Sequence, residues 1–257
     1  MTKIKIFLSV LACIALTNCG TEERFPLSKR YWDIKDYEAV VNELKFGYQN
    51  DEKLPSFNDP ETRLIVEKLT DEQNFIVVLE DKELGLSYKN EVAESFFKRW
   101  RILTSVYTKL DRKDKYIYEK EMLSVHQFGL GLQLRYFELG NKEIRANADD
   151  PSASNIQSLV KSNIKILVNN FTGYLDFVNE ETRFSAEGQQ FFAEGITKYL
   201  IPMINRYPEA DFDNLNRKVD LLLKKTKVPV IKTALETLKE LIFEKINRKR
   251  NKGESNS

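Results

Sequence analysis

The sequence predicts an all-α protein, an irregular bundle of about eight helices with a central antiparallel helical hairpin. Three observations lead to this fold class. Apolar residues recur at intervals of three and four through most of the chain, which is the spacing of one face of an α-helix. Capping residues, prolines and glycines separate these apolar patterns, as they do at helix ends. Since no internal repeat and no proline- or glycine-rich linker interrupts the pattern, we expect a single domain over residues 31–247.

Three helices are predicted in the first third of the domain. Asp33 is a favourable capping residue for a helix that extends to about residue 46. Pro60 is expected in the first turn of a second helix, where proline is tolerated. The segment Thr70-Asp71-Glu72-Gln73 is typical of a capping box for a third. The run Phe75–Leu79 that follows is also compatible with a strand, and we favour the helix.

The central hairpin is predicted from two long helices. A polar turn at residues 111–114 separates them. The second helix extends from about Lys115 to Leu139 and is expected to stop at Gly140-Asn141, a typical C-terminal signal. It is apolar on nearly every side, which predicts the most buried helix of the protein. The first helix carries one apolar seam: Val92, Phe96, Trp100, Leu103, Tyr107 and Leu110.

Four helices are predicted in the last part of the chain. A helix capped by Ser185 contains Pro202, which should kink it or end it early. Two more helices are expected over about residues 211–222 and 229–246. The first of the four, over about residues 150–178, carries an apolar stripe close to heptad spacing: Val160, Ile164, Leu167, Phe171, Tyr174 and Val178.

The first twenty residues have the order of a secretory signal. Two lysines precede an apolar run from Ile6 to Leu16, which is followed by a polar pair and Cys19. This segment resembles the signal peptide of bacterial lipoproteins, in which the cysteine becomes the acylated first residue of the mature protein. The resemblance implies a signal peptide at residues 1–18 and attachment to a membrane through lipid at Cys19. Cys13 is the alternative acylation site, and it would leave a shorter apolar run.

Residues 19–30 are expected to form a short tether between the lipid and the domain. Glu22 and Glu23 form an acidic pair close behind the cysteine. This pair resembles the export signal of lipoproteins from Bacteroidota, and the resemblance implies a lipid-anchored protein of the outer membrane. Whether the domain faces the periplasm or the cell surface is left open.

The composition excludes several kinds of function. The chain has 40 basic and 39 acidic residues, so no global basic excess points to nucleic acid. It has two cysteines, and acylation of Cys19 would exclude thiol catalysis, cysteine-ligated zinc and iron–sulfur clusters in the mature protein. We therefore expect no metal and no cofactor. Residues 248–257 contain no apolar side chain, which predicts a polar, disordered tail.

His126 is the only histidine and the first candidate for chemistry. Its helical neighbours are apolar, so we interpret it as a core residue rather than a general base. Gly129 and Gly131 lie within the same predicted helix, where each costs about 1 kcal/mol relative to alanine. Close approach of a neighbouring helix explains them best, and a gap for a ligand is the alternative. Glu187 and Glu194 share one face of a helix, which we interpret as solvated.

The sequence therefore predicts a lipid-anchored envelope protein that acts as a binding or interaction module, without catalytic activity. Its expected partner is another envelope protein, and its oligomeric state is left open. The alternative functions are an envelope hydrolase or a carrier of an apolar ligand, either of which would use a cleft near His126, Gly129 and Gly131.

Overall fold

A computed structural model describes residues 24–146 and 153–254 of the 257-residue chain, and over these residues the fold is all-α, as predicted. Within them no strand forms, and Leu110 and Tyr116 make an isolated β-bridge. Ten α-helices occur in the described part, with a 3-10 helix (η1) and a π-helix (η2): α2 Ile34–Gln49, α3 Arg63–Leu69, α4 Gln73–Leu79, α5 Leu86–Val106, α6 Glu119–Ala146, α7 Ala153–Tyr174, η1 Leu175–Arg183, α8 Ala186–Gly195, η2 Ile196–Leu200, α9 Ile201–Arg206, α10 Asp213–Lys225 and α11 Pro229–Glu254.

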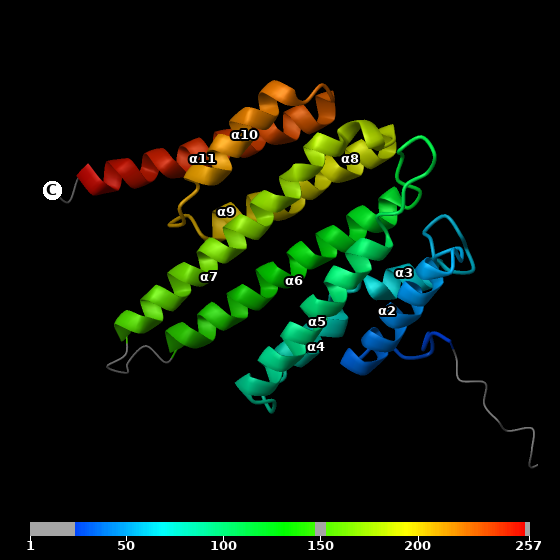
Figure 1. Cartoon of the computed structure of the whole chain (residues 1–257). Coiled ribbons are helices and arrows are strands. Elements are labelled where there is room, and N and C mark those ends of the chain that lie inside the picture. Colours follow the sequence, from blue (N-terminus) through cyan, green and yellow to red (C-terminus); the bar gives the residue numbers. More distant parts are fainter. Residues whose placement is uncertain (1–23, 147–152, 255–257) are drawn as a thin grey trace, which may run out of the picture.

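The helices α5, α6 and α7 run side by side across one face of the molecule, with α6 in the middle (Figure 1). The N-terminal helix α2 packs on α5, and the short helix α4 packs on α5 and α6. On the other side, α8 packs on α6, and α10 and α11 cover α7 and α8. The helix α6 therefore contacts both halves of the chain.

The middle of α6 is the centre of the core. Between residues 121 and 134 almost every side chain is buried, including Met122, Leu123 and Leu132. The buried polar residues of this segment all have partners: Glu121, for example, accepts hydrogen bonds from Ser56 Oγ at 2.8 Å and from a backbone amide. The prediction that this helix is the most buried one agrees with these exposures.

The predicted end of this helix at Gly140-Asn141 is wrong. The helix continues to Ala146, because tertiary contacts hold its last turns. Beyond the predicted stop, Asn141 is buried and Arg145 pairs with Glu209 at 3.8 Å. A local stop signal is overridden when the following turn is packed against another helix.

The long helix that contains Pro202 is interrupted, as predicted. The interruption takes the form of the π-helix η2, which is followed by a new helix with Pro202 in its first turn. Proline has no backbone N–H and cannot make the usual helical hydrogen bond to the preceding turn. The wider π-helical turn lets the helical path continue without that bond.

The helix caps predicted at Asp33 and Ser185 are correct, whereas the starts predicted at Pro60 and Thr70 are wrong. The carboxylate of Asp33 accepts hydrogen bonds from the first turn of α2 and forms a capping box. Ser185 Oγ accepts one from Gly188 N at the start of α8. Pro60, however, precedes α3, which begins at Arg63. The hydroxyl of Thr70 donates to the preceding helix instead of capping α4. The run Phe75–Leu79 is helical.

The described structure also includes residues on both sides of the expected domain, residues 31–247. Of the expected tether, residues 24–30 lie on the domain: Arg24 pairs with Glu43 and Glu52, and Pro26 O accepts the indole N–H of Trp32 at 2.9 Å. The tail expected to be disordered from residue 248 is helical as far as Glu254.

Candidate binding groove

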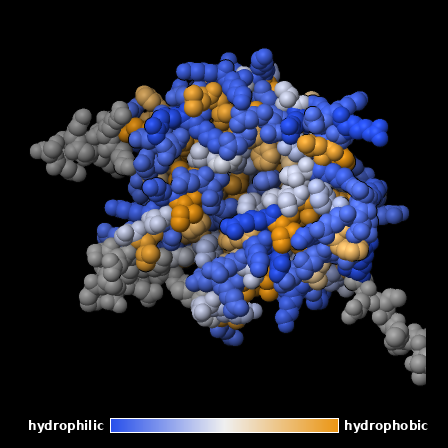
Figure 2. Space-filling view, viewed as in Figure 1, coloured by the Kyte–Doolittle hydropathy of each residue, from blue (hydrophilic) through white to orange (hydrophobic). Residues whose placement is uncertain are grey.

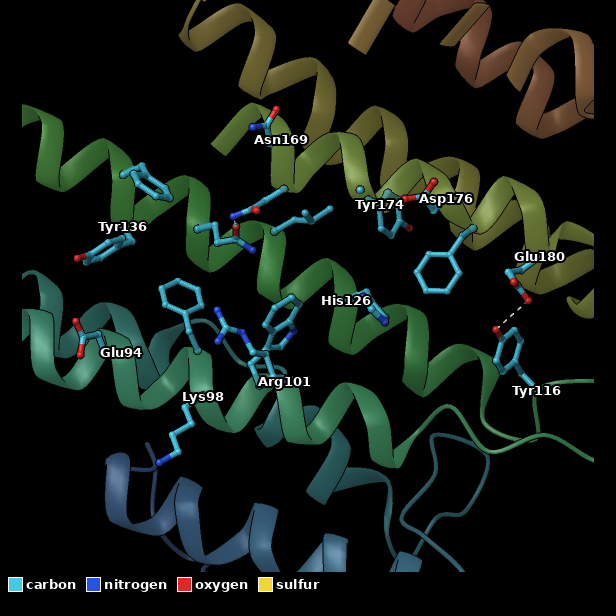
Figure 3. Close-up of a pocket in the computed structure, with 18 residues that line it drawn as sticks. Glu94, Lys98, Arg101, Tyr116, His126, Tyr136, Asn169, Tyr174, Asp176 and Glu180 are labelled. Carbon is cyan, nitrogen blue, oxygen red and sulfur yellow. Dashed lines mark hydrogen bonds between the residues drawn. The ribbon is translucent and has the colours of Figure 1, made fainter. Parts of the chain in front are cut away.

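A groove of about 1130 Å³ runs over α6 between α5 and α7. Its floor is one face of α6, formed by residues spaced four, three and four apart: His126, Leu130, Gln133 and Phe137. Figure 3 shows these helices with α6 in the middle, and with α5 and α7 on either side. The sequence favoured a core position for His126, with a cleft as the alternative; in the structure the residue is half-buried and lines this groove.

Aromatic rings line most of the groove. Phe177 stands edge-on to His126 with ring centres 4.8 Å apart, and Trp100 contacts the same imidazole at 6.1 Å. At the other end Phe97 meets Tyr136 at 5.9 Å. On the face that Figure 2 shows, apolar residues form several separate patches among hydrophilic ones. An open concave surface rich in aromatic rings is typical of a binding site.

The imidazole of His126 is not arranged for catalysis. Burial lowers its pKa from 6.5 to about 4, so the ring is neutral at physiological pH. Its described contacts are the rings of Trp100 and Phe177, and it makes no hydrogen bond with any residue of the described part. A general base needs a group that orients it and a nucleophile within reach, and neither is in contact with this ring.

Neutral amides supply the polar part of the groove. Asn170 Nδ2 donates to Gln133 Oε1 at 2.7 Å, and Gln133 Nε2 donates to the backbone oxygen of Gly129 at 3.1 Å. Gln133 is buried, whereas Asn170 is exposed on α7. This chain of hydrogen bonds fixes the orientation of both amides and leaves the outer one accessible to a ligand.

The two walls of the groove differ in whether their charged residues have partners of opposite charge. On the α7 side, Asp176 pairs with Lys218 at 2.7 Å and Glu180 pairs with Arg183 at 3.0 Å. On the α5 side, Lys98 and Arg101 are exposed and pair with no carboxylate of the described residues. In Figure 3 Arg101 lies beside the groove, while Lys98 extends away from α6 at its outer edge. Glu94 lines the same wall, so the α5 side carries two positive charges against one negative charge.

Gly129 and Gly131 do not line the groove, because other side chains occupy the space that they leave. A Cβ atom built on Gly129 would lie within 3.0 Å of three atoms of the Trp100 indole. A Cβ atom on Gly131 would meet the carboxylate of Glu72. The interpretation of a close approach is thus confirmed for Gly129, where Trp100 comes from the neighbouring helix α5.

The sequence analysis overlooked a different glycine. Gly173 lies on the groove wall near the end of α7, and a Cβ atom there would have no neighbouring atom within 4 Å. Its backbone does not adopt a positive φ, so neither conformation nor packing requires glycine at this position. Its place within the predicted helix was visible in the sequence, but the open space beside it depends on the tertiary structure.

A second cavity of about 710 Å³ adjoins the first at Tyr116. Its carboxylates are engaged within the protein: Glu119 accepts hydrogen bonds from Ser185, and Glu187 pairs with Lys120 at 3.3 Å. Gln190 donates to Glu194 at 2.9 Å, so the predicted solvated row is bonded along its own helix. Within the described segments no group of three or more His, Cys, Asp or Glu side chains could hold a metal ion.

The chain matches no family model, no curated protein and no solved structure. Among the helices of the described residues, none has the length and apolarity needed to cross a membrane. The predicted acylation site, Cys19, lies outside the described residues.

Proposed function

We propose that this protein is a lipid-anchored envelope protein that binds another envelope protein through the groove between α5 and α7. The observation that carries the proposal is the groove itself, in which aromatic rings, an exposed amide and a wall of net positive charge meet on an accessible surface. Gly173 adds to it, because a residue that costs helix stability stands beside empty space. A partner that approaches the α7 backbone closely would account for that glycine.

The two alternatives from the sequence have less support. A hydrolase needs a nucleophile near His126, and the ring meets Trp100 and Phe177 instead. A carrier with a cavity beside Gly129 and Gly131 has less support, because an indole and a carboxylate occupy the space next to these glycines.

The groove is tested with a blocked variant and a matched control. In Gly173→Leu a large side chain enters the groove, whereas Gly140→Leu places the same side chain at another helical glycine that has no neighbour within 4 Å and does not line the groove. Tagged proteins are purified from envelope extracts and their bound proteins compared. We expect a partner that wild-type protein and Gly140→Leu retain and Gly173→Leu loses. Identical bound proteins in all three samples would refute the groove as the binding surface.

The anchor is tested separately by cell fractionation. Cys19→Ala removes the proposed acylation site, and Cys13→Ala is the matched control because it removes the other cysteine. Stable attachment requires more than one acyl chain, and lipoproteins carry several. We therefore expect Cys19→Ala in the soluble fraction and Cys13→Ala in the membrane. Release of Cys13→Ala alone would show that Cys13, and not Cys19, carries the lipid.

A further inference from the structure

The helix α7 has a second apolar stripe in addition to the buried one. Leu159, Ile166 and Gly173 are spaced seven residues apart and so lie on one face of the helix. Leu159 is 55% exposed and Ile166 is 48% exposed. The stripe leads into the groove at Gly173 and extends it along α7 by about 21 Å, at 1.5 Å per residue.

The other two helices present the same periodicity to the groove. On the floor, the α6 residues from His126 to Phe137 cover about 16 Å of helix at spacings of three and four. On the α5 wall, Glu94, Phe97 and Arg101 follow the same spacing. The rows on α5, α6 and α7 lie beside one another, and the grooves between rows with helical spacing accept the side-chain ridges of another helix.

From these rows we infer that the groove takes an amphipathic α-helix of a partner protein, whose apolar face lies on α6 and whose α5-facing flank is acidic. The inference rests on the proposed function and names the chemistry of its partner. A small ligand would fill the groove and leave Leu159 and Ile166 exposed, whereas a helix of about three heptads covers both. Gly173 lets such a helix approach the α7 backbone.

The charges on the two groove walls indicate which flank of the bound helix is acidic. Arg101 lies beside the groove and has no carboxylate partner within the described residues, so it is available to a glutamate of the bound helix, and Lys98 adds positive charge at the outer edge. The acids Asp176 and Glu180 on the opposite wall already pair with Lys218 and Arg183. Complementary charges at the flanks of a helix select its partner and its orientation, as they do in coiled coils.

The test uses synthetic peptides of three heptads with leucine at the two core positions. One peptide has glutamate on one flank, a second has lysine on that flank, and a third has the glutamate composition in scrambled order. Binding to the chain carrying Cys19→Ala is measured by anisotropy of a labelled peptide. Trp100 fluorescence gives a second readout, because Trp100 lines the groove while Trp32 is buried.

We expect the glutamate peptide to bind and the scrambled peptide not to bind. The double variant Lys98→Glu/Arg101→Glu should weaken the glutamate peptide about tenfold and should bind the lysine peptide instead. The control Lys224→Glu/Lys232→Glu changes the net charge equally at exposed sites that do not line the groove, and should leave binding unchanged. Gly173→Leu should weaken binding at least tenfold, and Gly140→Leu should not.

Three outcomes overturn the inference. The glutamate peptide may fail to bind, it may bind every variant equally, or the charge reversal may leave the preference between peptides unchanged. Self-association of the protein that Gly173→Leu abolishes would also overturn it, by making a second copy of this chain the occupant. Each of these results leaves the capture experiment unaffected. The proposed function fails only when captured partners are independent of Gly173, so the two failures are distinguishable.

Discussion

Replacing Gly129 with alanine tests whether the contact between α5 and α6 is as close as the structure describes. The added methyl group would lie within 3.0 Å of the Trp100 indole. This indole is held in place because its Nε1 donates to Val125 O at 2.7 Å and its ring contacts His126. Unlike a flexible side chain, Trp100 cannot move aside without losing these contacts.

The two opposing effects have different sizes. Alanine in place of glycine within a helix contributes about 0.5–1 kcal/mol of stability. Overpacking a core costs about 1–3 kcal/mol, and loss of the indole hydrogen bond costs about 1 kcal/mol more. We therefore expect Gly129→Ala to lower the free energy of unfolding by about 1–3 kcal/mol. With a urea dependence of about 2–3 kcal/mol per molar, the midpoint falls by about 0.3–1.5 M.

Urea denaturation of the chain carrying Cys19→Ala measures this free energy. Gly140→Ala is the matched control, because a Cβ atom there meets no atom within 4 Å and the substitution should stabilise the protein by about 0.5–1 kcal/mol. Combining Gly129→Ala with Trp100→Phe should recover part of the loss through a coupling of the two sites. Equal stabilisation by Gly129→Ala and Gly140→Ala would refute the close approach.

Three further predictions concern stability. Gly131→Ala should change the free energy of unfolding much less than Gly129→Ala, because the neighbouring atoms belong to the movable carboxylate of Glu72; an equal loss in urea denaturation would contradict this. The pKa of His126 is about 4 in the folded protein and about 6.5 when unfolded, so the unfolded chain binds more protons between these values. Stability should therefore fall by about 1–3 kcal/mol as the pH decreases from 6.5 to 4. His126→Asn should lack this part of the pH dependence when urea denaturation is measured across the same range. An identical pH dependence in both proteins would show that His126 does not contribute to it. Glu181→Ala should cost about 2–3 kcal/mol in thermal unfolding, because it leaves Thr226 Oγ1 and Lys227 N, now 2.6 and 3.0 Å from the carboxylate, without their acceptor; an unchanged midpoint would show that water replaces it.

The candidate site was only partly predictable from the sequence. His126 was recognised because it is the only histidine, and it does line the groove. The two glycines near it were noticed for their helix position, yet their space is taken by Trp100 and Glu72. Gly173 and Arg101 were overlooked, because a glycine near a helix end and an arginine on a polar face are ordinary in a sequence. In the described structure Gly173 has open space beside it, and Arg101 has no carboxylate partner.

The sequence by itself determined the helical class, the apolar seams and the caps at Asp33 and Ser185, because these depend on residues within one or two turns of each other. The lipid anchor at Cys19 also follows from local order, and it stays a prediction. The tertiary structure decided that α6 continues past Gly140 and that residues 24–30 lie on the domain. It also decided which apolar stripe of α7 is buried and which remains open. These outcomes depend on contacts between segments far apart in the chain, which helical periodicity cannot specify.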